Sequence, residues 1–87
     1  MEIIFAKSAA KHSISKAEVI KIMVENTGTK VGLSRERLDK VAWIGGDSFN
    51  QLIEIIAIDF ITYKYVIHVM PISKRGGVRD GQMEGLW

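Results

Sequence analysis

The 87-residue sequence contains no cysteine and a single proline. The absence of cysteine excludes disulfide bridges and thiolate metal sites, and it is typical of proteins in a reducing compartment. No apolar run reaches the roughly 18 residues that a membrane-spanning helix needs. The N-terminal residues lack both the basic start and the long apolar stretch of a signal peptide. We therefore expect a soluble, cytoplasmic protein that does not enter a membrane.

Neither sign of charge is in large excess, since 12 basic and 10 acidic side chains give a net charge of +2. This balance permits an acidic partner but does not require one. The two histidines stand without paired carboxylates at ligand spacing, which makes a poor zinc site, so we expect neither a metal nor another cofactor. The length fits one small domain, which we assign to residues 1–75, followed by a flexible, glycine-rich tail at residues 76–87.

Residues 51–75 form the most strongly patterned stretch of the chain. Two apolar runs rich in Ile, Val, Phe and Tyr, broken by a more polar segment, predict the central hairpin of an antiparallel sheet. One register places Ala57 opposite His68. A slip by one residue places Ile56 opposite His68 and puts Glu54 on the same face. The turn contains no Gly, Asn or Pro, so both registers stay open, and each brings a carboxylate near the imidazole.

Residues 15–26 carry the clearest helix signal. Ser15 as N-cap with Glu18 three residues later is a capping box, and Ile14 is placed to pack on Val19. Apolar residues at helical spacing predict a buried stripe of Ala17, Ile20, Met23 and Val24, widened by Val19 and Ile22. Residues 6–12 contain good helix formers and predict a further helix of two turns.

The remaining segments give weaker patterns. Residues 2–5 are β-prone and predict an edge strand or the lead-in to the first helix, and the polar residues 27–39 predict an irregular loop or a weak strand. A strand at 40–44 and a Gly-Gly-Asp-Ser turn at 45–48 precede the apolar strand at 49–60. The pattern as a whole predicts an α+β fold with N-terminal helices packed on a small antiparallel sheet.

Several short motifs carry a resemblance to a known family. They are KHSISKAEVIKIM at residues 11–23, the Trp-Ile-Gly of residues 43–45, LIEIIAI at residues 52–58 and VIHVMPISKR at residues 66–75. In this order they resemble the small BrnT-like toxins of bacterial toxin–antitoxin systems, within the wider RelE-like fold. The resemblance implies N-terminal helices on an antiparallel sheet, cleavage of RNA, and neutralisation by a cognate antitoxin.

One departure from the family pattern concerns the basic residue after the proline. In relatives that share the His-x-Met-Pro strand, an arginine commonly follows shortly after it. Here Ile72 and Ser73 follow the proline, and the bases come later, at Lys74 and Arg75. Two interpretations stay open: the charge has shifted along the strand, or the site of the family is lost.

Cleavage of RNA without a metal needs proton transfer at the ribose 2′-OH and at the leaving oxygen, and positive charge near the phosphate. Histidine suits the first task because its pKa lies near neutrality, and arginine suits the second because its planar fork can hold two phosphate oxygens. We therefore expect His12 and His68 to transfer protons while Lys11 and Arg75 steady the phosphate.

Further positive charge for RNA comes from Lys74, Arg35 and Arg37. The alternative function is a non-catalytic protein-binding module whose sheet face or edge strand pairs with a partner. In that case His68 is a hydrogen-bonded, half-buried strand residue, and the basic side chains are ordinary solvated groups. The expected partners are RNA and an antitoxin that is acidic at the contact, in a homo- or hetero-oligomer whose composition stays open.

Overall fold

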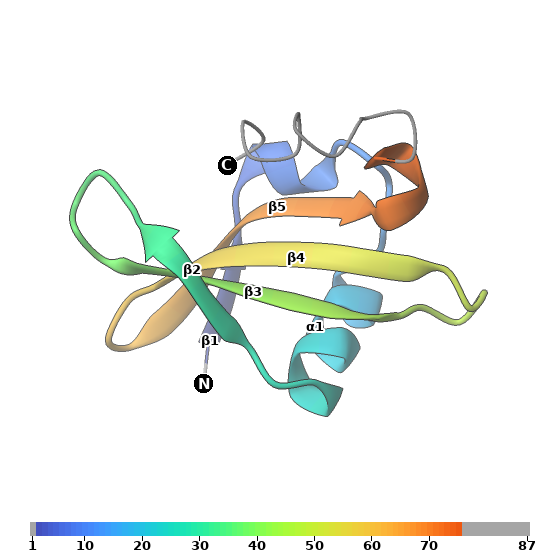
Figure 1. Cartoon of the computed structure of the whole chain (residues 1–87), viewed down its shortest axis with the longest axis horizontal. Coiled ribbons are helices and arrows are strands. Elements are labelled where there is room, and N and C mark those ends of the chain that lie inside the picture. The colour runs from blue at the N-terminus through green and yellow to red at the C-terminus, as the bar shows by residue number, and fades with distance from the viewer. Residues whose placement is uncertain (1, 76–87) are drawn as a thin grey trace.

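The computed structural model describes residues 2–75. Its elements are strand β1 (Glu2–Phe5), the 3-10 helix η1 (Lys7–Ala10), helix α1 (Lys16–Glu25), strands β2 (Thr29–Leu33), β3 (Asp39–Gly46), β4 (Leu52–Asp59) and β5 (Tyr63–Pro71), and the 3-10 helix η2 (Ile72–Arg75). Figure 1 shows the strands as one twisted sheet, with α1 beside β3. The tail expected at residues 76–87 lies outside the described residues.

Within residues 2–75 the strands form one five-stranded sheet in the order β1-β5-β4-β3-β2. The β2, β3, β4 and β5 neighbours are antiparallel, whereas β1 is parallel to β5, with Ile4 opposite Tyr65. The sheet is therefore mixed, and one α-helix accompanies it in the described part of the chain. The expected RelE-like arrangement of N-terminal helices on a small antiparallel sheet is wrong, because the N-terminal segment supplies a strand and only a short 3-10 turn before α1.

The 3-10 helix η1 replaces the two-turn helix expected at residues 6–12. The Ser8 hydroxyl donates a hydrogen bond of 2.8 Å to the Ile67 carbonyl of β5, and the Ala6 N–H donates to the Val66 carbonyl over 2.8 Å. These bonds tie the segment to the sheet, and a serine that binds backbone elsewhere weakens a regular helix. Ala9 is buried against the core as a result.

Helix α1 begins as the capping pattern predicts. The Glu18 N–H donates to Ser15 Oγ over 3.2 Å, and Ile14 packs against the core cluster that contains Val19. The buried face is narrower than the expected stripe: Val19, Ile22 and Met23 are buried. Val24 is 75% exposed and Ile20 and Ala17 are also exposed, so the expectation for these three residues is wrong. A ten-residue helix that packs on one face of a sheet buries one side only.

Helix α1 packs closely on β3 at a glycine. A Cβ on Gly45 would lie 2.8 Å from Ile22 Cγ2 and would also meet the Asn26 side chain. The Asn26 amide is itself held by a 2.8 Å hydrogen bond to the Ile22 carbonyl. The contact therefore requires a residue without a side chain at position 45. The turn expected at residues 45–48 lies two residues later, because β3 continues to Gly46.

The core lies between α1 and one face of the sheet. Strands β4 and β5 supply its centre with Ile53, Ile55, Ala57, Val66 and Val69, and β3 adds Trp43. Ile56 points to the opposite face of β4 and is still only 2% exposed. The apolar run of β4 is therefore buried on both faces, as its sequence predicts.

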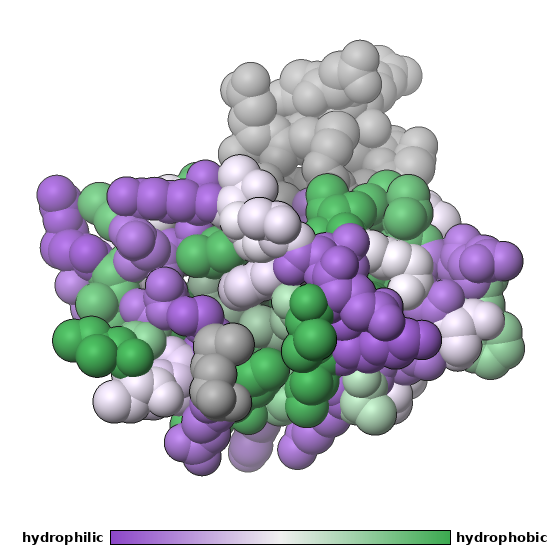
Figure 2. Space-filling view, turned by 90° about the horizontal axis from the view of Figure 1, so that it is seen from below, coloured by the Kyte–Doolittle hydropathy of each residue, from purple (hydrophilic) through white to green (hydrophobic). Residues whose placement is uncertain are grey.

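The large exposed hydrophobic side chains are spread over several elements, from Ile4 on β1 to Ile61 in the β4–β5 turn. Figure 2 shows hydrophobic groups separated by hydrophilic ones on the face that it presents. Single exposed apolar residues of this kind are normal on a globular surface. Among residues 2–75, no helix has the length and apolar character needed to cross a membrane.

Candidate functional site

The position of His68 is set by a β-bulge in β5. Near the turn Ala57 of β4 lies opposite Val66, whereas the next pair along joins Ile56 to His68. Ile67 is the extra residue between these pairs, which is the definition of a bulge. Because neighbouring residues of β4 point to opposite faces, Val66 enters the core and His68 lies on the face away from α1. Of the two expected registers, the one with Ile56 opposite His68 holds from His68 onward.

On this face His68 meets a buried carboxylate. His68 Nε2 lies 3.4 Å from Glu54 Oε1, and the side chains are 30% and 4% exposed respectively. Glu54 lies between Ile44 of β3 and Met70 of β5. The imidazole of His68 therefore lies against the buried Glu54 carboxyl group. The pair thus combines a partly exposed histidine side chain with a buried acidic partner.

A carboxylate beside an imidazole is also an arrangement that proton-transfer sites use. A carboxylate beside an imidazole fixes the ring orientation and stabilises the imidazolium that forms when the ring accepts a proton. Glu54 is the carboxylate that one of the two expected registers places on the face of His68, and it is a candidate partner of that histidine. The signal that identifies it is a glutamate in the middle of an otherwise apolar strand, since such a residue is rarely buried without a partner.

The basic residues after β5 follow the histidine closely along the chain. Lys74 and Arg75 belong to η2, which starts directly after Pro71 and contacts β4. Pro71 itself lies opposite Ile53, the neighbour of Glu54. The backbone of η2 therefore lies near the end of β4 that carries Glu54. The side chains of Lys74 and Arg75 lie outside the described part of the structure.

The other expected catalytic pair occupies a different element. Lys11 and His12 lie in the connection between η1 and α1, where Lys11 is exposed and His12 is half-buried. The structure thus brings His68 to Glu54 and places Lys11 and His12 on the segment that leads into α1.

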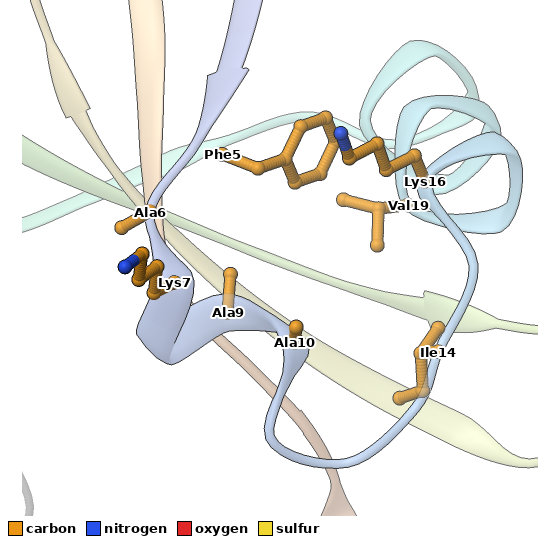
Figure 3. A pocket seen from close by; sticks show the side chains of 8 residues that line it. All are labelled: Phe5, Ala6, Lys7, Ala9, Ala10, Ile14, Lys16 and Val19. Atoms are coloured by element: carbon orange, nitrogen blue, oxygen red, sulfur yellow. The ribbon is translucent and has the colours of Figure 1, made fainter.

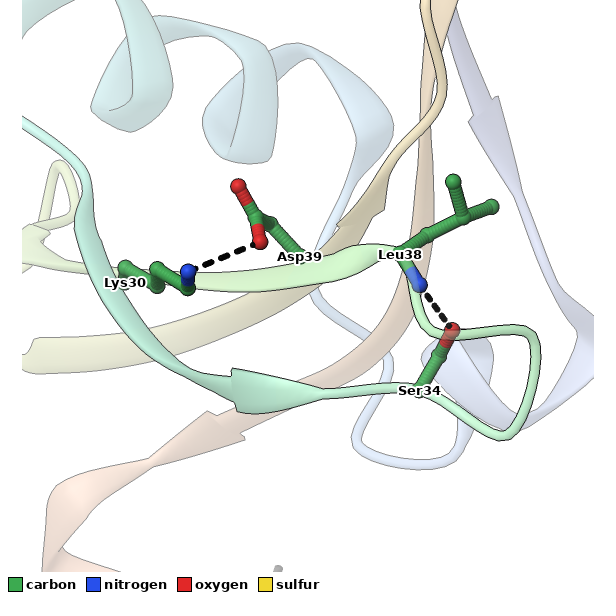
Figure 4. A network of polar contacts seen from close by, with 4 residues as sticks. All are labelled: Lys30, Ser34, Leu38 and Asp39. Carbon is green, nitrogen blue, oxygen red and sulfur yellow. Dashed lines mark hydrogen bonds and ion pairs between the residues drawn. The ribbon is translucent and has the colours of Figure 1, made fainter.

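Arg35 and Arg37 lie in the turn between β2 and β3, and both are exposed. The turn is closed by Ser34, whose Oγ accepts from the Leu38 N–H over 3.2 Å, and Lys30 pairs with Asp39 at 3.1 Å just before it, as Figure 4 shows. Strand β2 forms one edge of the sheet, and two strands separate it from β5. The two arginines are therefore on a part of the molecule distinct from the His68–Glu54 pair.

A cavity of about 240 Å³ lies on the α1 side, between η1 and the start of α1. Phe5, Ile14 and Val19 supply its large apolar side chains. The Lys16 ammonium lies 5.4 Å from the centre of the Phe5 ring, and Figure 3 shows it above the ring. Lys7 also borders the cavity, with its ammonium turned away from Val19 in that view. This cavity and the His68–Glu54 pair lie on opposite faces of the sheet.

The β3–β4 turn is organised by one carboxylate. The N–H groups of Phe49 and Gln51 each donate to Asp47 Oδ1 over 2.9 Å, and the Gln51 side chain donates to Oδ2 over 3.1 Å. The hydrogen bond from the Gln51 backbone is the main cause that holds the pKa of Asp47 below its ordinary value of 3.8. These bonds satisfy the polar groups of the turn, so Asp47 has a structural role.

Comparison of the chain with protein-family models, with curated proteins and with solved structures gave no match. The function is therefore argued from the residues and their geometry.

Proposed function

We propose that the protein is a metal-independent ribonuclease that acts as the toxin of a toxin–antitoxin pair, with His68 as the group that transfers protons. The observation that carries the proposal is the 3.4 Å approach of the partly exposed His68 to the buried Glu54. In this mechanism the imidazole accepts the proton of a ribose 2′-OH, whose oxygen attacks the adjacent phosphorus and expels the 5′-oxygen. Glu54 stabilises the resulting imidazolium.

The basic residues at the end of β5 are the candidates for stabilising charge on the phosphate. Arg75 and Lys74 follow β5 directly, and we assign to them the stabilisation of the phosphoryl oxygens as charge builds there. In the BrnT-like toxins that residues 66–75 resemble, a basic residue also follows this strand, although here the bases come later, at Lys74 and Arg75. His12 and Lys11 remain candidates for protonating the leaving oxygen and for binding the RNA backbone. The loss of His68 is therefore expected to lower the cleavage rate strongly. The contribution of His12 is measured with a separate variant.

The test is cleavage of a labelled RNA of mixed sequence by the purified protein in the presence of EDTA. His68→Ala is expected to lower the rate by roughly 10²-fold or more, the scale of removing one acid–base group. Glu54→Gln, which keeps the size of the side chain, is expected to lower it by roughly 10-fold or more. The products should end in 2′,3′-cyclic phosphates, and an oligonucleotide with 2′-deoxyribose throughout should stay intact.

His12→Ala is the informative comparison, because it removes the other histidine. A loss similar to that of His68→Ala indicates two proton-transfer groups, and an unchanged rate assigns the chemistry to His68. If the wild type cleaves no RNA, or if His68→Ala cleaves as well as the wild type, the proposal is wrong. Expression of the wild type, but not of His68→Ala, is also expected to slow the growth of a bacterial host.

The second candidate function is a non-catalytic protein-binding module, and strand β2 favours it. This strand is an edge of the sheet, and its Val31 and Leu33 side chains are each 44% exposed. An extended segment of a partner can add to such an edge. Because Arg35 and Arg37 lie beside it, an acidic segment such as that expected of an antitoxin is the complementary partner.

The edge-strand candidate predicts binding that depends on salt and on the arginines. With a co-purifying partner, affinity should fall as the salt concentration rises and should fall further in the Arg35→Glu, Arg37→Glu double variant. Lys21→Glu, which reverses an exposed charge on α1, is the control and should bind as the wild type does. If neither the salt concentration nor the Arg35→Glu, Arg37→Glu substitutions change the affinity, the edge at β2 is not the binding surface. The cleavage assay then decides the ribonuclease proposal independently.

A further inference from the structure

We infer that the cavity between η1 and α1 binds a small carboxylic acid with one compact apolar ring. This site is separate from the proposed ribonuclease site, since it lies on the α1 side of the sheet. Its interior is apolar, because Phe5, Ile14 and Val19 line it together with the small side chains of Ala9 and Ala10. Val19 and Ala9 are buried and form its floor.

The volume of the cavity limits the size of the ligand. A cavity of roughly 150 Å³ in a protein interior accepts benzene. The cavity described here is about 240 Å³, which leaves room for one aromatic ring and a short acidic arm. A ligand of this size buries its ring against Phe5 and Val19, so the hydrophobic effect favours binding.

The charge at the rim selects an acid over a neutral molecule. The charged side chains that line the cavity are Lys7 and Lys16, and no carboxylate lines it among the described residues. Lys16 lines the cavity, and its ammonium lies close to the Phe5 ring (Figure 3). A carboxylate there gains an ion pair with Lys16 while the ring of the ligand contacts the apolar floor. Lys7, with its ammonium turned outward, contributes less.

Phenylacetate is the probe that tests this inference, and phenylacetamide is its neutral counterpart of the same shape. In titrations of the full chain at pH 7 followed by amide NMR shifts, phenylacetate should saturate with a Kd of about a few millimolar, as expected for so small a ligand. The shifts should gather at Phe5, Ala10, Ile14 and Val19. The Kd of phenylacetamide should be higher than that of phenylacetate by about 5-fold or more.

Two kinds of variant test the contributions of the ion pair and of the apolar wall separately. Lys16→Met keeps the apolar part of the side chain and removes only the ion pair. It should therefore raise the Kd of phenylacetate by about 5-fold and leave the Kd of phenylacetamide unchanged. Lys7→Met should have a smaller effect, and Lys21→Met, outside the cavity, should have none. Ala10→Leu places a larger side chain at an exposed position of the wall and should remove binding of both probes, with the amide spectrum showing that the fold is kept. If Ala10→Leu does not fold, the Lys16→Met comparison of the two probes decides.

The inference is overturned if phenylacetate does not saturate up to about 20 mM, roughly several times the expected Kd. It is equally overturned if the two probes bind alike, if Lys16→Met weakens both to the same degree, or if the shifts lie on the His68 face of the sheet.

Discussion

Val66 and His68 lie two residues apart on β5 and face opposite sides of the sheet, because Ile67 forms a bulge between them. In a regular strand, residues two apart share a face. Without the bulge, His68 would enter the core opposite Ile55, or Val66 would leave the core. The bulge therefore lets one strand complete the core under α1 and also present a histidine to Glu54. Bulges are often found beside functional sites, where they direct a side chain.

The bulge also explains how far the sequence could predict the candidate site. The pattern of residues 51–75 predicts the hairpin, and both registers bring a carboxylate near His68. Neither register alone describes β5, since Ala57 lies opposite Val66 and Ile56 lies opposite His68. The position of a bulge cannot be read from a run of Val and Ile residues, because these side chains are accepted on either face of a strand that is buried on both sides. The choice is made by packing against α1, which depends on residues far away in sequence.

The first prediction concerns the burial of β4 on the face that packs under α1. Ile55 is fully buried under α1, so Ile55→Ala should lower the free energy of unfolding by roughly 2 to 5 kcal/mol. Leu52 on the same strand is 54% exposed, and Leu52→Ala is the matched control, with an expected loss of roughly 0.5 kcal/mol. Urea denaturation measures both. Equal losses would mean that β4 does not lie under α1 as described.

The second prediction concerns the close packing of α1 on β3. Gly45→Ala should lower the free energy of unfolding by about 1 to 3 kcal/mol, because the new methyl group would meet Ile22 and Asn26. Gly46 is the neighbouring residue on the opposite face, and a Cβ there meets nothing within 4 Å. Gly46→Ala should therefore be nearly neutral. Thermal denaturation of the two variants gives the comparison, and a neutral Gly45→Ala would place α1 farther from β3.

The contrast between α1 and β1 shows which local signals determine structure. Ser15 and Glu18 predict the start of α1 because the cap involves atoms only three residues apart. Strand β1 has four residues, and its partner β5 begins at Tyr63, so no local pattern indicates their parallel pairing. This pairing made the sheet mixed. Likewise, the hydrogen bond from Ser8 to the Ile67 carbonyl is a long-range contact that shortens η1.

The third prediction tests the cap of α1. Ser15→Ala removes the oxygen that accepts the Glu18 N–H and should lower the free energy of unfolding by roughly 1 kcal/mol. Ser15→Asp keeps an acceptor at the N-cap and should restore most of the loss. Urea denaturation at constant salt measures the three proteins. A loss that Ser15→Asp fails to reverse would argue against capping as the role of this side chain.

The last prediction uses the titration of Asp47. Its pKa is lowered in the folded state, chiefly by the hydrogen bond from the Gln51 backbone. A carboxyl whose folded pKa is depressed contributes stability that is fully present above its unfolded pKa and is lost as the pH falls through the folded value. Asp47→Asn keeps an oxygen acceptor and removes the charge. The wild type should therefore have the higher Tm at pH 7, and the difference should shrink as the pH falls below 3.8. Ser48→Ala changes an exposed, non-titrating side chain of the same turn, so its Tm difference from the wild type should not vary with pH. If the Asp47→Asn difference is as large well below pH 3.8 as at pH 7, the ionised carboxylate does not stabilise the turn.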